Sequence, residues 1–292
     1  MTQAIETLDR VRYNTQKVGD LDIFYREAGD PSRQAVVLLH GFPSSSHMYR
    51  EVLSALGNQY YLIAPDYPGF GESSMLSAED YTYTFDNLAE TINQFLVERE
   101  LNDYVLMIHD YGAPVGFRIA TKHPEKVKGF IVMNGNAYED GLGEMVMQSL
   151  QQERTLEAEA AMVESTFNLQ AIKWQYTHGT RIPESISPDN WNLDAMKITR
   201  EGADKINVNL LFDYPSNVKL YPQWQQYLRD TQPPMLITWG KNDPFFIESG
   251  AEAYKRDVKE IDYNILDTGH FPLEEDSQFI IAKMRDFLKT IK

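Results

Sequence analysis

The chain has 292 residues, a length that suits one large domain with an insertion better than two independent domains. Hydrophobic residues make up 42% of it, which is enough for a globular protein with a sizeable core. The formal net charge of −16 argues against nucleic acid and anionic membranes as partners, because proteins that bind them carry basic patches.

Cysteine is absent from the sequence, which excludes disulfides, thiol nucleophiles and thiolate metal sites. The opening stretch MTQAIETLDRVRYN contains acidic residues and no apolar run of secretory length, so we expect no signal peptide. No uncharged run reaches the ~20 residues that a membrane-spanning helix needs. These features predict a cytoplasmic protein.

Apolar runs and turn residues predict strands and helices that alternate along most of the chain. The predicted strands span residues 11–18, 21–26, 35–39, 60–64, 105–108, 127–133, 235–239 and 261–266. Helices are predicted to begin near His47 and to span residues 84–100, 111–123, 249–257 and 276–290. This alternation indicates an α/β fold with a mostly parallel, doubly wound sheet that helices cover on both faces. Functional loops are then expected at the carboxyl ends of the strands.

The strand pattern disappears between residues 138 and 221. This stretch contains a Glu/Ala-rich helical run at 151–163 and several aromatic residues. Because it is inserted after the sixth strand, we interpret it as a helical cap over the functional site. Residues 1–137 and 222–292 would then form the core domain, and the alternative is a separate helical domain.

One acidic residue stands where an apolar strand turns sharply into a helix. In the segment Leu106–Gly116, with the sequence LMIHDYGAPVG, the residue at the turn is Asp110. A strand-to-helix turn of this kind can present a nucleophile at its apex. The alternative is an aspartate that only caps the following helix.

Three further stretches accompany this turn. They are AVVLLHGFPSSS from Ala35, PDYPGFGES from Pro65, and the pair TWGKNDPFF and LDTGHF, which places Asp243 and His270 just after two predicted strands. Asp110, Asp243 and His270 follow the chain order nucleophile, acid, histidine. In these motifs the sequence resembles the Asp-nucleophile branch of the α/β-hydrolase superfamily, the epoxide hydrolases and haloalkane dehalogenases. The matching segments are spread over nearly the whole chain outside its middle quarter.

This resemblance implies an α/β-hydrolase fold and a two-step reaction that needs no metal or organic cofactor. Asp110 would attack a saturated carbon to form an alkyl–enzyme ester. His270 would activate the water that hydrolyses this ester, and Asp243 would orient the imidazole and stabilise its cationic form. Ile108 departs from the family pattern, which usually has glycine or another small residue two positions before the nucleophile.

The acid has a second possible place. Relatives divide between an acid at the position of Asp243 and one after the sixth strand. In this chain the latter place holds Asn134, which cannot serve as an acid, although Glu139 and Asp140 follow slightly farther on. We therefore predict Asp243 as the acid.

The resemblance also implies groups around the reacting atoms. The backbone N–H groups of Phe42 and Tyr111 are the implied oxyanion donors. Haloalkane dehalogenases typically have Trp beside the nucleophile, where this chain has Tyr111, whereas epoxide hydrolases use cap tyrosines to protonate the ring oxygen. Tyr214 is the best-placed cap tyrosine, and Tyr176 and Trp174 are further candidates for contact with the substrate or leaving group.

The sequence therefore predicts a hydrolase that acts on a small apolar organic substrate, with an epoxide as the favoured one. A haloalkane or a short haloacid is the alternative substrate. A ligand-binding homologue that no longer turns over is an alternative of another class, and the presence of Asp110, Asp243 and His270 together argues against it.

Overall fold

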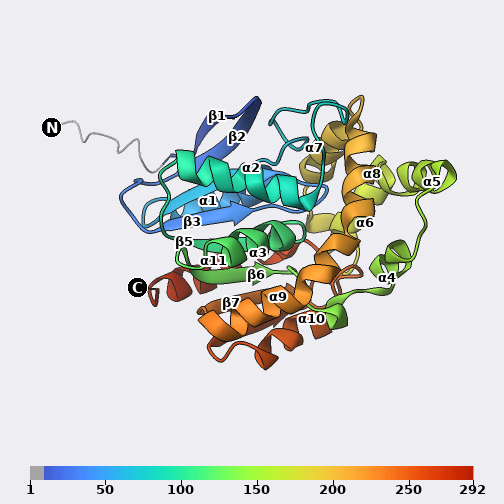
Figure 1. Cartoon of the computed structure of the whole chain (residues 1–292). Helices are drawn as coiled ribbons and strands as arrows, with labels where there is room; N and C mark the ends of the chain where they lie inside the picture. Colours follow the sequence, from blue (N-terminus) through green and yellow to red (C-terminus); the bar gives the residue numbers. More distant parts are fainter. Residues whose placement is uncertain (1–9, 292) are drawn as a thin grey trace.

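The structure, a computed structural model, describes residues 10–291 and is built on one eight-stranded sheet (Figure 1). The strand order is β1-β2-β4-β3-β5-β6-β7-β8, and only the β1–β2 and β2–β4 pairs are antiparallel. The strands are β1 (Arg12–Val18), β2 (Leu21–Ala28), β3 (Ala35–Leu39), β4 (Tyr61–Pro65), β5 (Tyr104–His109), β6 (Val127–Met133), β7 (Met235–Gly240) and β8 (Ile261–Leu266). Each predicted strand is present, with bounds that differ by at most two residues.

Helices cover both faces of this sheet. On one face α1 (Arg50–Leu56) packs against α11 (Pro272–Leu288), and on the other α2 (Phe85–Glu98), α3 (Gly112–Lys122) and α9 (Pro215–Thr231) lie in a row (Figure 1). Every residue of β3, β4, β5 and β7 is buried, because parallel strands covered on both faces have no solvent side. The predicted α/β class is confirmed.

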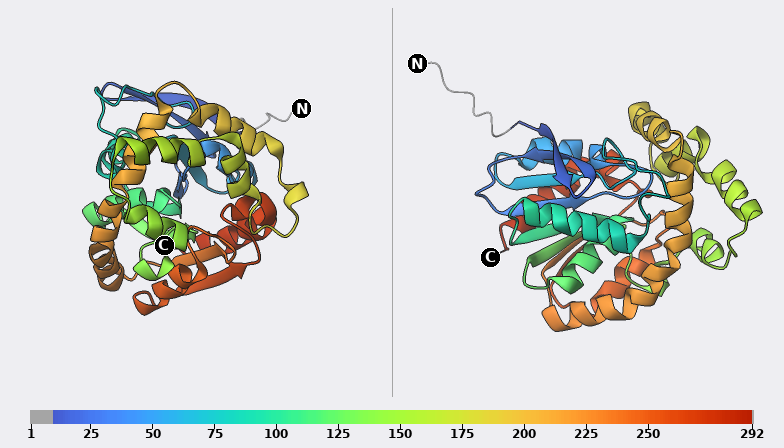
Figure 2. Two further views of the ribbon diagram at one scale, coloured as in Figure 1. Left: turned by 90° about the vertical axis from the view of Figure 1, so that its right-hand side faces the viewer. Right: turned by 45° about the horizontal axis from the view of Figure 1, so that its top comes forward.

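A second group of helices lies between β6 and β7 in the sequence and beyond one end of the sheet in space (Figures 1 and 2). Its members are α4 (Glu144–Leu150), α5 (Leu156–Thr166), α6 (Leu169–Thr177), α7 (Pro188–Ile198) and α8 (Ala203–Asp213). From there α9 returns to the sheet and continues past Tyr221, the predicted end of the cap. Trp224 of α9 stacks on Phe117 of α3, with ring centroids 5.4 Å apart. The division into core and cap stays a prediction.

The remaining helices are short or bent. They are the α-helix α10 (Glu248–Ala253) and the 3-10 helices η2 (Ser46–Tyr49), η3 (Glu139–Gly141), η4 (Pro183–Ser185) and η5 (Tyr254–Arg256). The last helix, α11, begins four residues before its predicted start and bends at Asp276, whose backbone is non-helical. Within residues 10–291 no helix is both long and apolar enough to cross a membrane.

Candidate active site

Asp110 occupies the turn between β5 and α3 with a positive φ of 49°, which non-glycine residues rarely adopt. Two glycines make room for this turn. A Cβ on Gly112 would lie 2.2 Å from the carbonyl oxygen of Leu39, and a Cβ on Gly41 would lie 2.3 Å from the Cβ of Asp110. The chain can therefore hold the carboxylate close to the end of β3 only with glycine at both positions.

The unusual Ile108 is accommodated by the same packing. A Cβ on Gly116 would lie 2.7 Å from the Cγ2 of Ile108, so the branched side chain fills the space that glycine leaves on α3. A Cβ on Gly135, after β6, would lie 3.3 Å from the Cγ1 of Ile108. Two positions before Asp110, this chain therefore has the large Ile108 where the family pattern has a small residue, and Gly116 of α3 leaves the space for it.

The carboxylate of Asp110 receives backbone hydrogen bonds. The N–H of Phe42 donates to Oδ1 at 2.6 Å, and the N–H of Tyr111 also donates to the carboxylate. These are the two donors that the sequence predicted for an oxyanion. Both N–H groups therefore stabilise negative charge on the Asp110 carboxylate.

His270 lies between the two predicted acidic residues. Its Nδ1 is 2.8 Å from Oδ2 of Asp243, and its Nε2 is 3.9 Å from Oδ2 of Asp110. Asp243 is anchored by Asn134, whose Nδ2 donates to Oδ2 at 2.7 Å, and by the backbone N–H of Phe245, which donates to Oδ1 at 2.8 Å. The Nε2 of His270 is too far from Asp110 for a direct hydrogen bond and can accept a proton from a water molecule instead.

Burial and neighbouring charges have opposite effects on the pKa of Asp110, and also on the pKa of His270. Burial raises the pKa of Asp110 to about 6, although the His270 imidazole and the N–H groups of Phe42 and Tyr111 oppose the shift. For His270, burial lowers the pKa, but the carboxylates of Asp243 and Asp110 and the hydrogen bond to Asp243 outweigh it and leave the pKa raised. The carboxylates therefore stabilise the imidazolium that forms when His270 takes up a proton, and the contribution of Asp110 would be lost if that residue carried an ester, which would lower the pKa of His270 for the step in which it acts as a base.

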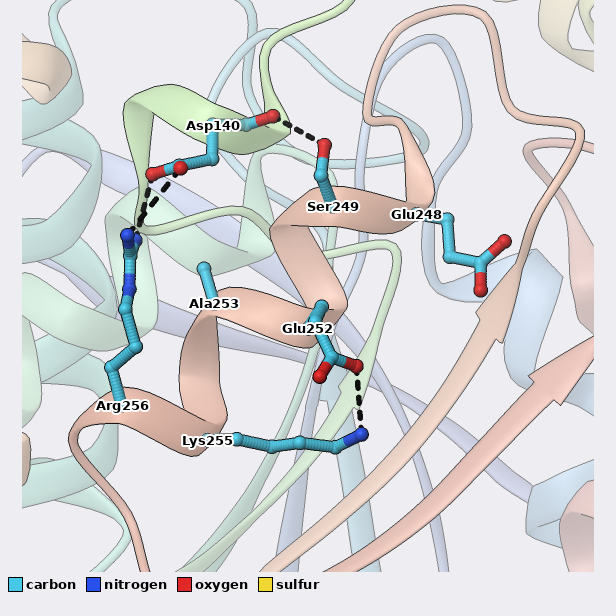
Figure 3. Close-up of a pocket in the computed structure, with 7 residues that line it drawn as sticks. All are labelled: Asp140, Glu248, Ser249, Glu252, Ala253, Lys255 and Arg256. Carbon is cyan, nitrogen blue, oxygen red and sulfur yellow. Dashed lines mark hydrogen bonds and ion pairs between the residues drawn. The ribbon is translucent and has the colours of Figure 1, made fainter.

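The alternative acid after the sixth strand lies elsewhere. Asp140 is exposed and accepts a hydrogen bond from Nη2 of Arg256 at 2.7 Å, in a surface pocket beside α10 (Figure 3). Its neighbour Glu139 is exposed as well. Neither carboxylate contacts His270 in the described part of the chain. Sequence reasoning excluded Asn134 as an acid but missed its bond to Asp243, which the adjacency of β6 and β7 could have suggested.

The candidate residues open into a cavity of about 90 Å³. From the sheet side it is lined by Phe42, Asp110, Tyr111, Phe245, Phe246 and His270. From the helical side it is lined by Val146, Ser149, Thr166, Gln175, Leu211 and Tyr214. Arg, Lys and Trp do not occur among these twelve lining residues, so carboxylate and imidazole are the charged groups of the cavity.

Two of the four predicted contact residues line this cavity, and two do not. Tyr111 and Tyr214 line it, and their ring centroids are 6.4 Å apart. The Tyr111 hydroxyl is buried without a hydrogen-bond partner among residues 10–291. The Tyr214 hydroxyl shares a hydrogen bond with Tyr221, which accepts another from Nδ2 of Asn136 at 3.3 Å. Burial is the largest cause that raises the pKa of both cavity tyrosines well above its usual value, so both keep their protons.

Tyr176 and Trp174 of α6 face other surroundings. The Tyr176 hydroxyl donates to Oδ2 of the buried Asp194 at 2.5 Å, and its ring stacks on Phe271 at 4.0 Å. Trp174 is partly exposed and lies in an outer chamber. Gln175, which lies between these two residues in the sequence, lines the inner cavity. Sequence reasoning missed this residue. Neighbouring helical residues point about 100° apart, so three consecutive side chains cannot all face one point.

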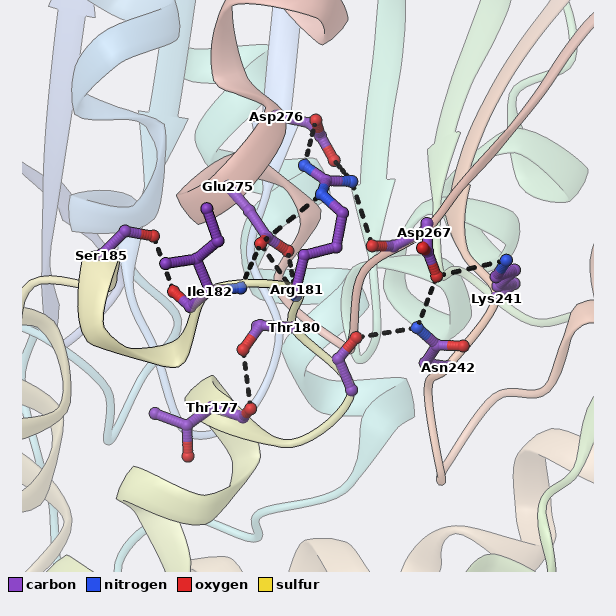
Figure 4. Close-up of polar contacts among 11 residues, drawn as sticks. Thr177, Thr180, Arg181, Ile182, Ser185, Lys241, Asn242, Asp267, Glu275 and Asp276 are labelled. Carbon is purple, nitrogen blue, oxygen red and sulfur yellow. Dashed lines mark hydrogen bonds and ion pairs between the residues drawn. The ribbon is translucent and has the colours of Figure 1, made fainter.

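The loop after α6 is tied to the two loops that carry Asp243 and His270 (Figure 4). Arg181 donates to Asp276 at 2.8 and 3.1 Å and to the carbonyl oxygen of Asp267 at 3.0 Å. The carbonyl oxygen of Gly179 accepts from Nδ2 of Asn242 at 2.8 Å. The helical group is thus fixed to the sheet beside the candidate site. Among the described residues, no group of three or more His, Asp or Glu side chains is placed to hold a metal ion.

Comparisons with known proteins agree with this architecture. The family model described as alpha/beta hydrolase fold matches residues 34–277. An uncharacterized hydrolase of Saccharomyces cerevisiae is 39% identical over 269 residues, which cover 90% of this chain and 92% of the yeast protein. An epoxide hydrolase from Vigna radiata has a TM-score of 0.76 at 22% identity, with 98% of this chain and 100% of that one covered. A mutant haloalkane dehalogenase from Agrobacterium tumefaciens has a TM-score of 0.80 at 19% identity, with 96% and 97% covered.

Proposed function

The chain belongs to the alpha/beta hydrolase fold family of enzymes, and from that membership we propose a hydrolase that opens epoxides through an ester on Asp110. The observation that carries the proposal is the position of the Asp110 carboxylate. The carboxylate lines the cavity and accepts hydrogen bonds from the backbone N–H groups of Phe42 and Tyr111, with Phe42 at Oδ1, and its Oδ2 lies 3.9 Å from Nε2 of His270. A buried carboxylate so placed can attack the substrate as a nucleophile, and His270 can then activate the water that hydrolyses the ester.

In the first step, Oδ2 of Asp110 attacks a ring carbon of the epoxide and the carbon–oxygen bond of the ring breaks. The ring oxygen takes up a proton from Tyr214 or Tyr111, which both line the cavity and remain protonated. The product of this step is a hydroxyalkyl ester. The phenolate left by this step is protonated again after the second step, because hydrolysis of the ester leaves Asp110 as a carboxylic acid that must lose one proton before the next turnover.

In the second step, Nε2 of His270 takes a proton from a water whose oxygen attacks the Cγ of Asp110. Negative charge then develops on Oδ1, where the N–H groups of Phe42 and Tyr111 stabilise it. Collapse of this intermediate breaks the bond between Cγ and Oδ2 and releases the diol, which takes the proton from His270. Asp243 stabilises the imidazolium while the proton is held.

The cavity lining supports an epoxide over the alternatives. An epoxide oxygen needs a proton donor when the ring opens, and the cavity offers two phenols for this purpose. A haloacid would bring a carboxylate, for which the twelve lining residues supply no Arg or Lys. A haloalkane remains the alternative substrate, because the same carboxylate and histidine can displace a halide.

The test uses His270→Gln, which should allow ester formation but stall hydrolysis. Incubation with 1,2-epoxyoctane should raise the intact protein mass by the full mass of the epoxide, and digestion should locate the addition at Asp110. Wild-type protein should release the diol, and Asp110→Asn should do neither. Bromide release from 1-bromooctane without any diol from epoxides would assign the enzyme to haloalkanes instead. Binding of both compounds without turnover would make it a ligand-binding homologue.

A further inference from the structure

A larger outer chamber adjoins the cavity beside Asp110. This chamber has a volume of about 600 Å³ and lies between α4, α5 and α6. The two spaces share Val146, Ser149, Thr166, Gln175, Leu211 and Phe245, which form a neck between them. A molecule whose reacting carbon lies at Asp110 can therefore extend through the neck into the chamber.

The outer chamber carries no charge in a strongly charged protein. Its fourteen lining residues include no Asp, Glu, Lys or Arg, whereas 24% of the whole sequence is charged. Large apolar side chains stay partly exposed at its surface, with Met145 at 49% and Trp174 at 37% exposure. Exposed apolar side chains around a concave site mark a place for an apolar ligand. The chamber thus suits an uncharged, apolar tail.

Gln175 is the polar group in the neck that lacks a partner. Its side chain is 5% exposed, and its amide forms no hydrogen bond with any residue between 10 and 291. Two other polar residues nearby have partners: Ser149 donates to the carbonyl oxygen of Val146 at 2.8 Å, and Gln148 donates to Glu144 at 3.1 Å. The amide is reached from the cavity, unlike the Tyr111 hydroxyl, which is fully buried without a partner. A ligand in the neck can therefore supply the hydrogen bond that the protein does not.

We propose that Gln175 is a specificity-determining residue that binds a neutral oxygen of the substrate a few atoms beyond the reacting carbon. The substrate class is then an uncharged epoxide with an ether oxygen close to the ring and an apolar remainder in the outer chamber. This inference rests on the proposed epoxide hydrolysis and adds to it the part of the substrate that does not react.

A pair of isosteric epoxides tests the role of Gln175. Butyl glycidyl ether and 1,2-epoxyoctane have side chains of equal length, and they differ by one oxygen in place of a methylene group. Wild-type enzyme should prefer the ether in kcat/KM by about tenfold, the size expected for one neutral hydrogen bond. Gln175→Met keeps a straight side chain of similar length and should abolish this preference. Gln148→Met, a matched change on the chamber wall, should leave it intact.

The possible outcomes separate this inference from the proposed function. Equal rates on both epoxides in the wild type, or an ether preference that survives Gln175→Met, would overturn the role of Gln175 while epoxide hydrolysis stands. The absence of diol from either compound would overturn the proposed function and this inference with it. Equal melting temperatures of wild type and Gln175→Met would show that a loss of preference does not arise from misfolding.

Discussion

The two sides of the cavity are built by different means. On the sheet side, Asp110, Asp243 and His270 follow the ends of three parallel strands, and glycine contacts or backbone N–H groups hold their surroundings. On the helical side, Gln175 comes from the nine-residue helix α6 and Tyr214 from the junction between α8 and α9. Their hydroxyl and amide groups have few partners. The order of the strands therefore positions the groups that are proposed to react. The orientation of the helical segments positions the groups that are proposed to contact the rest of the substrate.

The largest effect is expected from a substitution on the sheet side of the cavity. Asp243→Asn removes the carboxylate that stabilises the His270 cation and should lower kcat on the order of 10⁴-fold, by analogy with the serine-protease triad. Single-turnover kinetics should show that hydrolysis of the ester is the step affected. The matched control is Asp140→Asn, which removes an exposed ion pair with Arg256 and should change kcat little. A crippling effect of Asp140→Asn would place the acid after the sixth strand instead.

The next effect belongs to the helical side. Tyr214→Phe removes one of the two proposed proton donors and should slow ester formation by about 10²-fold on an epoxide. Hydrolysis of the ester should be unchanged, because its charge develops at the N–H groups of Phe42 and Tyr111. Burst kinetics with 1,2-epoxyoctane measure the two steps separately. Tyr176→Phe serves as the control, since its hydroxyl is directed at Asp194 and not at the cavity. An equal loss in both variants would contradict the assignment of Tyr214.

The difference between the two sides of the cavity also determines which site residues can be predicted from the sequence. Parallel strands end at one edge of the sheet, so the order of motifs was enough to bring Asp110, Asp243 and His270 together. The sequence suggests Trp174 and Tyr176 for contact with the substrate because they are aromatic and lie in the predicted cap. Their actual directions depend on how α6 is rotated against the sheet, which its own sequence does not specify.

Tertiary contacts explain the other differences. The bond from Asn134 to Asp243 joins residues 109 positions apart, and the fit of Ile108 depends on Gly116 across the strand–helix packing. Such contacts form only once the sheet is assembled. Sequence patterns describe neighbours along the chain, so they locate Asp243 but not its anchor.

The smallest expected effect concerns stability at the boundary between the two sides. Burial raises the pKa of Asp194 to about 8, against hydrogen bonds from Tyr176 and Ser44 that lower it, and the carboxylates of Glu274 and Asp66 raise it further. In the unfolded chain an aspartate has a pKa of ~3.9. Between these values the folded protein keeps a proton that the unfolded chain releases, so this residue lowers stability as the pH rises from about 4 to about 8.

Asp194→Asn removes this penalty, because an amide has no proton to lose and can still accept from Tyr176 and donate to Ser44. The melting temperature of Asp194→Asn should exceed that of the wild type by on the order of 5 °C at pH 8, and the difference should shrink at pH 5. Scanning calorimetry at both pH values measures this. Asp257→Asn is the opposite control, since it weakens the ion pair with Arg229 and should destabilise the protein. A lower melting temperature of Asp194→Asn at pH 8 would mean that Asp194 is ionised in the folded state, and the helical group would then be held to the sheet by charge.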